Sequence, residues 1–289
     1  MIRLALIGPE MASEYSAISS RVVGATIVMA DTIEESLRAS SDSIDAIVTN
    51  GPLQVETIEL AANAGKHLLV ESPIASSAQR ADEMIANCDR YGVSLMTGQA
   101  MRFLPEVAAI KESLESGKLG EAGLLRIHHW GAARQSDIGR IVREIDLANW
   151  IFGRVPSEIY AAGTVSEFVQ LHFGFGEAMA VIDFATTPSD KSGYFSMSVI
   201  GSTGAAYADD HRNMQVLFGG NQPAAITTST GNLHRLAQLQ EFVSAINEGR
   251  SPAITGADGR AAIQVAEASM ESLSSGQAMR FVAGEYAQA

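Results

Sequence analysis

Short apolar runs alternate with helix-period segments over the first 120 residues of the chain. Runs of this kind, bounded by glycine, proline or polar residues, are typical of strands buried in a parallel sheet. Strands are predicted at residues 2–7, 25–30, 44–48, 68–70 and 93–96, and helices at 12–22, 32–38, 55–64, 76–90 and 104–116. This order predicts a mostly parallel sheet with helices on both faces, whose carboxyl strand ends would bind ligands.

The pattern changes after residue 120. A strand at 124–130 and an amphipathic helix at 140–152 are followed by predicted strands at 159–163, 169–173, 178–184 and 195–200, and then by helices at 233–247 and 260–273. Turns rich in glycine, serine, threonine and aspartate separate the strands, which predicts an antiparallel sheet. The predicted fold class is α/β, with a shortened Rossmann-type domain over residues 1–120 and an α+β domain with an open antiparallel sheet over residues 121–289.

The composition and net charge of the chain exclude several classes of function. The chain has 289 residues, of which 46% are hydrophobic, and a formal net charge of −13, which suits two ordinary domains. An acidic balance of this size opposes binding to nucleic acid or to an anionic membrane surface. No run approaches the roughly 18 apolar residues of a membrane span, and a single cysteine, Cys88, excludes an internal disulfide. We therefore expect a cytoplasmic protein that acts on neither nucleic acid nor membrane.

Two motifs lie at the ends of the fourth and fifth predicted strands. Residues 64–73 read Ala-Gly-Lys-His-Leu-Leu-Val-Glu-Ser-Pro, and residues 98–105 read Gly-Gln-Ala-Met-Arg-Phe-Leu-Pro. They resemble signatures of the Gfo/Idh/MocA family of NAD(P)-dependent oxidoreductases, which includes glucose-fructose oxidoreductase and inositol dehydrogenase. Weaker motifs in the family's order extend the resemblance over nearly the whole chain; they lie at residues 119–121, 145–153, 200–204, 241–246 and 255–259.

The resemblance implies a cofactor, a ligand and a partner. The cofactor would be NAD or NADP, the ligand a sugar or polyol, and the partner a second copy of the chain that pairs through the open sheet of the C-terminal domain. The positions that would bind the cofactor are Gly8, Asp31, Thr49, Glu71, Pro73 and Gln99.

The first strand-to-helix turn is poorly suited to a dinucleotide. Such a turn needs glycines, so that the diphosphate can approach the backbone and the helix N-terminus. Here it reads Gly8-Pro9-Glu10; Pro9 lacks an N–H donor, and Glu10 places a negative charge where the diphosphate would lie. Asp31 fits either the acid that binds the adenosine ribose or the N-cap of the next helix; the cap is favoured, with Thr32 as a competing cap. We expect weak or absent dinucleotide binding.

The catalytic positions are also changed. Hydride transfer from an alcohol carbon needs a nearby group that accepts the hydroxyl proton, and the resemblance implies a lysine in Glu-Lys-Pro and an Asp-x-x-x-His pair for this task. The aligned positions here are Ser72, Gly139 and Arg143. Arg143 stays protonated and cannot act as a base, and Ser72 is a weak proton acceptor without an adjacent base.

His128 and His129 are the remaining candidates for acid–base chemistry. They end the first strand of the second domain, which in the family leads toward the substrate cleft. Adjacent residues on a strand face opposite ways, so at most one of the two points inward; one buried and one surface histidine without a chemical role is the alternative interpretation. No metal site is expected, because the run Asp209-Asp210-His211 reads as a solvated turn.

Two hypotheses follow. The first is a diverged family member that lacks the usual dehydrogenase chemistry and acts as a ligand-binding, regulatory or partner protein, or does unrelated chemistry in the same cleft. The second is an active NAD(P)-dependent oxidoreductase on a sugar or polyol with a relocated base. Ser72, Gly139, Arg143 and the turn at Gly8 favour the first hypothesis.

Overall fold

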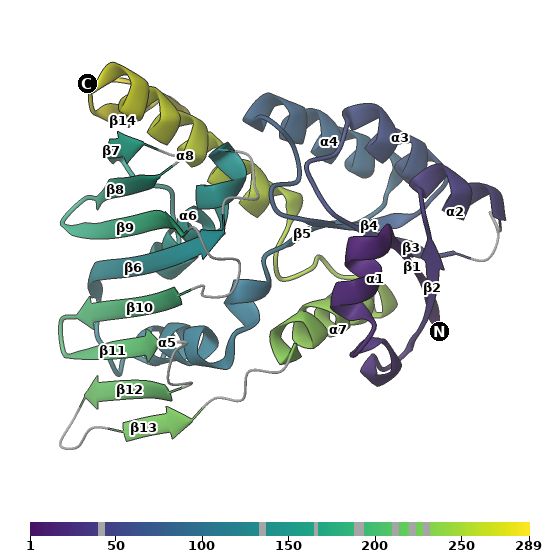
Figure 1. The fold of residues 1–289 in the computed structure, drawn as a ribbon, viewed down its shortest axis with the longest axis horizontal. Coiled ribbons are helices and arrows are strands. Elements are labelled where there is room, and N and C mark those ends of the chain that lie inside the picture. Colours follow the sequence, from purple (N-terminus) through teal and green to yellow (C-terminus); the bar gives the residue numbers. More distant parts are fainter. Residues whose placement is uncertain are drawn as a thin grey trace. The chain divides into compact units, whose positions relative to one another are not determined.

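The computed structural model describes residues 1–39, 44–132, 137–164, 167–187, 194–209, 214–219, 224–227 and 232–289. The chain forms two compact units (Figure 1). Unit 1 comprises Met1–Phe103 and Gly231–Ile263, and unit 2 comprises Leu104–Thr230 and Gln264–Ala289. The domain boundary at residue 120 stays a prediction.

Unit 1 is built on a parallel sheet of five strands in the order β2-β1-β3-β4-β5. The strands are β1 (Ile2–Ile7), β2 (Ala25–Ala30), β3 (Ala46–Thr49), β4 (His67–Glu71) and β5 (Leu95–Gly98). The helices are α1 (Pro9–Tyr15), α2 (Ile33–Ala39), α3 (Val55–Asn63), α4 (Ala78–Tyr91) and α7 (Leu233–Glu248), with short 3-10 helices η1 (Ser19–Arg21) and η2 (Ala100–Phe103). Every predicted strand of this region is present within a few residues.

Helix α1 differs from its prediction. A helix over 12–22 was expected, but α1 begins at Pro9 and ends at Tyr15. Proline fits the first helical position because the missing N–H would be unsatisfied there anyway. The helix ends early where serine hydroxyls compete for backbone carbonyls: Ser19 Oγ donates to Tyr15 O at 2.7 Å, and η1 follows.

The core of unit 1 includes a helix that is distant in sequence. Leu239, Phe242 and Val243 of α7 are fully buried and belong to one apolar cluster with residues of β1, β3 and α1. The apolar face of α7 is visible in the sequence, but the partner of that face is not. Hydrophobic periodicity predicts that a helix buries one side and says nothing about which sheet it covers.

Unit 2 is built on a mostly antiparallel sheet of ten strands in the order β13-β12-β11-β10-β6-β9-β8-β7-β14-β15. The strands are β6 (Ala122–Ala132), β7 (Glu158–Thr164), β8 (Phe168–Phe175), β9 (Ala178–Thr187), β10 (Tyr194–Gly201), β11 (Gly204–Asp209), β12 (Met214–Gly219), β13 (Ala224–Thr227), β14 (Met279–Val282) and β15 (Glu285–Gln288). The parallel sheet of unit 1 and this second sheet confirm the predicted α/β fold class. One pairing within this mostly antiparallel sheet, that of β6 with β9, is parallel.

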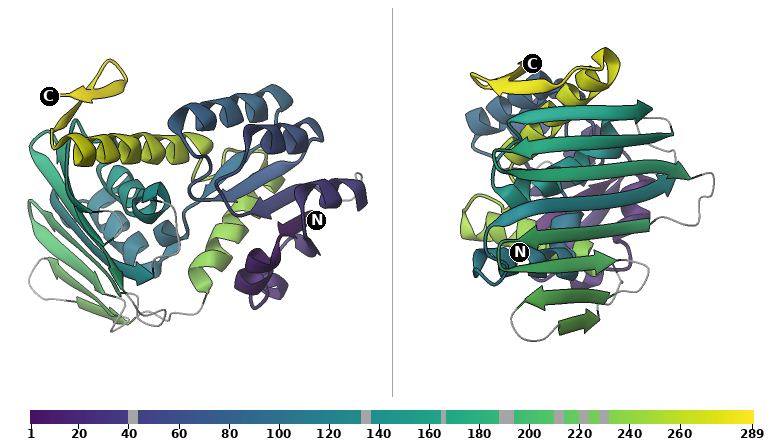
Figure 2. Two further views of the ribbon diagram at one scale, coloured as in Figure 1. Left: turned by 45° about the horizontal axis from the view of Figure 1, so that its top comes forward. Right: turned by 90° about the vertical axis from the view of Figure 1, so that its left-hand side faces the viewer.

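Helices cover one face of this sheet. They are α5 (Pro105–Glu115), α6 (Asp137–Phe152) and α8 (Gly256–Ser275), whose last twelve residues belong to unit 2. Helix α6 packs on β6 and β9, and α5 packs on β10 and β11. No described helix of unit 2 covers the other face, which Figure 2 shows in its right-hand view. Large apolar side chains are exposed on this open face; they are Trp130, Tyr160, Phe168, Met179, Ile200 and Tyr207.

Candidate functional site

The carboxyl edge of the parallel sheet brings the sequence-predicted cofactor positions together. Gly8 follows β1, Asp31 follows β2, Thr49 ends β3, and Glu71 ends β4. Pro73 and Gln99 follow Glu71 and Gly98, which are paired across β4 and β5. Because the strands are parallel, all these ends lie at one edge, where doubly wound sheets bind ligands.

The first turn at this edge is occupied by an acidic side chain. Gly8 adopts a φ of +86°, a conformation that glycine reaches without strain. Pro9 is the first residue of α1, and the helix has only seven residues. Asn50, after β3, donates through Nδ2 to Glu10 Oε2 at 2.9 Å. The turn therefore offers a carboxylate and a proline where a diphosphate would need N–H donors.

The turns after β3 and β4 are in close contact at Gly51. A Cβ atom on Gly51 would lie 2.5 Å from the carbonyl oxygen of Glu71 and closer still to that of Pro73. Only glycine fits this approach. The rearranged Thr49-Asn50-Gly51 turn thus supports the backbone that carries Glu71 and Ser72.

The preferred interpretation of Asp31 as a helix cap is wrong. Thr32 Oγ1 accepts a hydrogen bond from Glu35 N at 3.0 Å, and Glu35 Oε2 accepts one from Asp31 N at 2.9 Å. Thr32 is therefore the N-cap, and the arrangement differs from a capping box only in that Glu35 accepts from the backbone N–H of Asp31, the residue before the cap. The side chain of Asp31 makes no hydrogen bond to another described residue, so its role as the ribose acid stays a prediction.

Glu71 is held by three side chains that no sequence motif groups with it. Tyr15 donates its hydroxyl to Glu71 Oε1 at 2.5 Å, and Gln238 Nε2 donates to the same oxygen at 2.8 Å. The guanidinium of Arg235 lies 3.8 Å from Oε1. Burial and the charge of Glu71 raise the pKa of Tyr15 well above its ordinary value. Tyr15, Arg235 and Gln238 come from α1 and α7, and no spacing in the sequence connects them with β4.

Gly98 leaves room for the carboxylate of Glu71. A Cβ atom at Gly98 would lie 2.6 Å from Glu71 Oε2. The glycine of the Gly98–Pro105 motif and the glutamate of the Ala64–Pro73 motif are therefore a matched pair. This packing explains why the two motifs belong together.

Tyr15→Phe tests the strength of this cluster. It removes one hydrogen bond to a carboxylate, and such bonds contribute about 1.5–3 kcal/mol, so we expect the free energy of unfolding in urea to fall by that amount. Tyr160→Phe is the control, because Tyr160 is exposed on the open sheet face and its change should be small. Equal stabilities of the two variants would contradict the role assigned to the Tyr15–Glu71 bond.

Ser72 has no base beside it. Gln99 Nε2 donates to Ser72 Oγ at 3.1 Å, and no described imidazole or carboxylate bonds to this hydroxyl. Gln99 is buried, and its Oε1 has no hydrogen-bond partner among the described residues. A serine hydroxyl needs an adjacent base to act as a nucleophile or proton carrier.

The remaining candidates belong to unit 2. Gly139 is buried in α6, and Arg143 on the same helix is partly buried, with its Nε lacking a hydrogen-bond partner among the described residues. His129 lies on the helix-covered face of β6, where its Nδ1 is 2.5 Å from Oε1 of Glu144 on α6. Glu144 is not among the residues predicted from the sequence, although its place next to Arg143 in a predicted amphipathic helix was a usable signal.

His128 and His129 each pair with a carboxylate, on opposite faces of the sheet. His128 Nδ1 lies 2.6 Å from Asp183 Oδ2 on the open face, where the two side chains are 43% and 29% exposed. The side chains of His129 and Glu144 are 21% and 0% exposed. The strand alternation thus separates one solvated pair from one buried pair.

The electrostatics of Glu144 depend on its neighbours. Burial alone would raise the pKa of its carboxyl, but the charge and hydrogen bond of His129 and the charge of Arg143 outweigh it and hold that pKa below its ordinary value. The second oxygen, Oε2, is buried and has no partner among the described residues. Glu144 is therefore a buried carboxylate that depends on His129.

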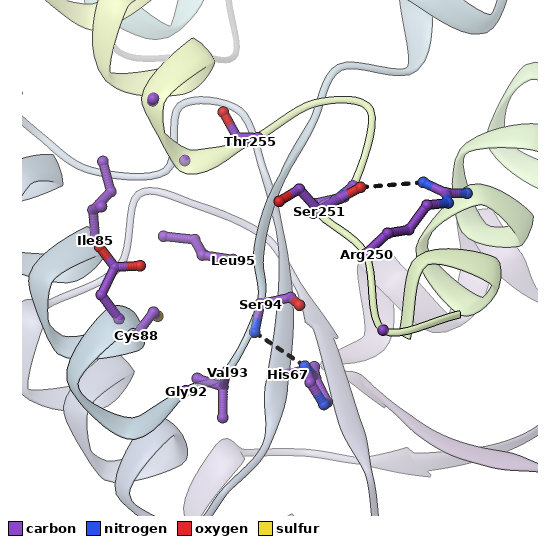
Figure 3. A pocket seen from close by; sticks show the side chains of 15 residues that line it. His67, Ile85, Cys88, Gly92, Val93, Ser94, Leu95, Arg250, Ser251 and Thr255 are labelled. Carbon is purple, nitrogen blue, oxygen red and sulfur yellow. Dashed lines mark hydrogen bonds between the residues drawn. The ribbon is translucent and has the colours of Figure 1, made fainter. Parts of the chain in front are cut away.

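A separate pocket of about 600 Å³ lies at the amino edge of the parallel sheet (Figure 3). His67 Nδ1 accepts a hydrogen bond from Ser94 N at 3.0 Å, and burial lowers the pKa of this histidine. Arg250, on its rim, is bound by Glu241 and Glu248. Burial raises the pKa of the Cys88 thiol to about 12, so the thiol is inert. The pocket contains none of the residues predicted to bind cofactor or substrate.

The described residues form neither a metal-ligand cluster nor a membrane-spanning helix. No group of three or more histidine, cysteine, aspartate or glutamate side chains is arranged to hold a metal ion within the described ranges. Asp210 and His211, part of the run considered for metal binding, lie outside those ranges. No described helix combines the length and apolar character that crossing a membrane requires.

The sequence matches two profiles of one protein family. Residues 11–99 match the "oxidoreductase family, NAD-binding Rossmann fold" profile, and residues 111–281 match the "oxidoreductase family, C-terminal alpha/beta domain" profile. The chain is 27% identical over 248 residues to the myo-inositol 2-dehydrogenase of Thermotoga maritima, covering 75% of this chain and 73% of that protein.

Solved structures share the fold. A scyllo-inositol dehydrogenase from Lactobacillus casei, solved with NAD(H) and scyllo-inositol, matches with a TM-score of 0.80 at 17% identity, over 97% of this chain and 99% of that one. An aldose-aldose oxidoreductase from Caulobacter crescentus, complexed with glycerol, matches with a TM-score of 0.79 at 19% identity, over 97% and 99% of the two chains. Both profiles, in order and over most of the sequence, establish that the chain belongs to the Gfo/Idh/MocA family of oxidoreductases.

Proposed function

We propose that this chain is a diverged Gfo/Idh/MocA protein that lacks the lysine-dependent dehydrogenation implied for the family and acts as a ligand-binding, regulatory or partner protein. The observation that carries the proposal is the Asn50–Glu10 hydrogen bond at the first turn of the Rossmann sheet. It fixes a carboxylate at the place where a dinucleotide diphosphate would need N–H donors.

The changed catalytic positions support the same proposal. Ser72 bonds only to Gln99 among the described side chains, and Arg143 cannot accept a proton. Gly139 has no side chain to orient a histidine. The three positions implied for lysine, aspartate and histidine therefore supply no base.

The cofactor of the family does not fit the residues of the first turn. The profile that matches residues 11–99 is described as an NAD-binding Rossmann fold, and NAD(H) is bound in the Lactobacillus casei structure. In this chain, Pro9 lacks an N–H donor and Glu10 adds a negative charge. Of the turn residues, only Gly8 has the positive φ that glycine adopts without strain. We assign Gly8, Asp31, Thr49, Glu71, Pro73 and Gln99 as the edge that would contact a dinucleotide if one binds weakly.

Titration calorimetry with NAD and NADP tests the cofactor proposal. The loss of two charge-assisted hydrogen bonds, at roughly 1.5–3 kcal/mol each, weakens binding by two or more orders of magnitude, so we expect no micromolar dissociation constant. The double change Pro9→Gly, Glu10→Ala should tighten binding, while the exposed-face change Gln170→Ala should leave it unaltered. A micromolar constant for the wild type would refute the proposal.

The open face of the ten-stranded sheet is our proposed site of homo-oligomerisation. Its exposed large apolar residues include Trp130, Phe168 and Ile200, and several such residues on one sheet face that no described helix covers favour an interaction site there. We propose a sugar or polyol as the ligand class, because the relative from Thermotoga maritima is a myo-inositol dehydrogenase.

The alternative function is an active oxidoreductase with a relocated base. The observation that favours it is the 2.5 Å contact between His129 and Glu144, because an imidazole oriented by a carboxylate is a common general base. His128 is the weaker candidate, since its pairing with Asp183 lies on the open sheet face.

A further inference from the structure

The cavity at the amino edge of the parallel sheet is a second candidate binding site, and it lies wholly within unit 1. Its volume of about 600 Å³ is in the range of small-molecule pockets. The start of β4, the end of α4, the start of β5 and the segment that leads from α7 into α8 form its wall (Figure 3). The proposed function concerns the opposite, carboxyl edge of the sheet and assigns no role to this cavity.

The segment between α7 and α8 is held in place by the protein itself. Arg250 Nη1 and Nη2 donate to the two carboxylate oxygens of Glu241 at 2.6 and 2.8 Å, and Ala253 N donates to Glu241 Oε1 at 2.8 Å. Thr97 N, on β5, donates to Ile254 O at 3.2 Å. The wall is therefore fixed without a ligand, as in the largely pre-formed sites that bind small molecules.

Part of the cavity wall is apolar. Ile85, Val93 and Leu95 line it together with Cys88, and Val93, Leu95 and Cys88 are buried. Gly256 lets the first turn of α8 approach these side chains, because a Cβ atom there would lie 2.9 Å from Ile85 Cγ1 and 3.0 Å from Leu95 Cδ2. A polyol hydroxyl placed against this wall would lose its bond to water without a replacement. The wall therefore favours a ligand with apolar faces.

His67 offers the cavity a hydrogen-bond donor. Its Nδ1 accepts from Ser94 N at 3.0 Å, and burial lowers the pKa of the ring, so His67 is neutral at pH 7 with its proton on Nε2. Nε2 makes no hydrogen bond to another described residue. The hydroxyls of Ser94 and Ser251 also have no partner among the described residues, and each can donate or accept. The polar part of the wall thus matches a ligand with acceptors at its edge.

The charges around the cavity disfavour an anion. Arg250 is already paired with two glutamates, and Asp89 is an exposed carboxylate on the lining. The N-terminus of α8 is occupied by its own acid, since Thr255 N and Oγ1 both donate to Asp258 Oδ2, at 2.8 and 2.7 Å. No lining residue supplies an unpaired cation to hold a phosphate or carboxylate. A ligand that fits this site is uncharged, and an amine on it would meet Asp89.

We propose that this cavity binds an uncharged purine base, free or as its nucleoside. The apolar faces of the ring match Ile85 and Leu95, a ring nitrogen accepts from His67 Nε2, and an exocyclic amine donates to Asp89. A free polyol lacks the apolar faces, and a nucleotide carries phosphate charge for which the cavity has no partner. The site is separate from the edge considered for a dinucleotide, so the inference does not depend on the proposed function.

Titration calorimetry with adenine, adenosine, AMP and scyllo-inositol tests the class of ligand. We expect adenine and adenosine to bind the wild type with dissociation constants below about 1 mM, AMP to bind about tenfold more weakly because of its charge, and scyllo-inositol to give no signal. Failure of both adenine and adenosine to bind would overturn the proposal. Equal binding of AMP and adenosine would overturn the assignment of an uncharged ligand.

Variants of the lining test the position of the site. Ser251→Trp places a large side chain at an exposed position of the lining and should weaken adenosine binding about tenfold or more, whereas Ser20→Trp, at an exposed serine elsewhere in unit 1, should not. His67→Phe removes the Nε2 donor and should weaken binding about tenfold, the factor for one hydrogen bond. Circular dichroism checks that each variant is folded. Unchanged binding in both Ser251→Trp and His67→Phe would overturn the proposal.

Hydrogen–deuterium exchange with adenosine separates this site from the carboxyl edge. We expect slower exchange in peptides that cover residues 92–95 and 249–257, no change in residues 8–12, and the same adenosine affinity in Asp31→Asn as in the wild type. Protection of residues 8–12 that disappears in Asp31→Asn would place the base at the dinucleotide edge and refute the inference. No readout uses NAD, NADP or nicotinamide turnover, so failure here is distinguishable from failure of the proposed function.

Discussion

Replacing His129 alone by leucine is expected to destabilise the protein by about 3–5 kcal/mol at neutral pH, because it leaves a buried carboxylate without its partner. Glu144 is fully buried, and His129 supplies its only described side-chain hydrogen bond. The free energy of unfolding in urea measures the loss. His128→Leu is the matched control, since the exposed pair with Asp183 should contribute only about 0–1 kcal/mol.

Replacing both partners should restore stability. In the double variant His129→Leu, Glu144→Met, two apolar side chains fill the space and no charge is buried. Such replacements of buried pairs are often neutral or stabilising. A double variant as stable as the wild type supports the view that the pair is kept for chemistry; a double variant as unstable as His129→Leu would show that the pair is structural.

The stability loss in His129→Leu should depend on pH with a definite sign. In the wild type the pKa of Glu144 lies below its ordinary value of 4.5, so its contribution is present above about pH 4.5 and is lost as the pH falls through the folded-state pKa. Without His129, burial is opposed only by Arg143 and the backbone, and the pKa of this carboxyl should rise. The difference between wild type and variant should therefore be small near pH 4 and grow toward pH 7.

Restoring a lysine at Ser72 is not expected to create a dehydrogenase. General acid–base catalysis contributes about 10²–10⁴-fold, and the lysine alone would lack the aspartate and histidine implied for the family. We expect no reduction of nicotinamide by Ser72→Lys, and the first measurable rate only in the triple change Ser72→Lys, Gly139→Asp, Arg143→His.

Thermal unfolding shows whether Ser72→Lys and the triple variant are folded, which is the control for a missing activity. A lysine at the half-buried Ser72 position costs stability unless it pairs with Glu71, so each variant must be shown to be folded at the assay temperature. Turnover by Ser72→Lys alone would contradict the account, because it would mean that the rest of the site is intact.

The sequence predicted the elements of the Rossmann sheet because those strands are fully apolar and bounded by glycine or proline. The first two strands, Ile2–Ile7 and Ala25–Ala30, have the predicted bounds. The short strands β11 to β15 were missed, since β13 to β15 have four residues each and carry little periodicity. The parallel pairing of β6 and β9 was also missed, because alternation reports which face a residue occupies and not the direction of its neighbour.

The candidate site could be predicted only where its residues share a motif. Glu71, Ser72 and Gln99 were found because they follow buried strands. Tyr15 and Gln238 were not found, since they meet Glu71 from helices separated by more than 200 residues in the sequence. The pairing of His129 with Glu144 likewise depends on how α6 crosses β6, which no local pattern specifies.

The most direct test of the central claim is an absorbance assay for reduced nicotinamide with the wild-type protein, NAD or NADP, and myo-inositol, scyllo-inositol and glucose. We expect no detectable reduction of NAD or NADP with any of the three substrates. The reason is the changed turn at Gly8-Pro9-Glu10 together with the changed positions Ser72, Gly139 and Arg143. Steady reduction of NAD or NADP with one of these substrates would contradict the account. If His129→Gln abolished this turnover and His128→Gln kept it, the protein would be an active oxidoreductase whose base is His129.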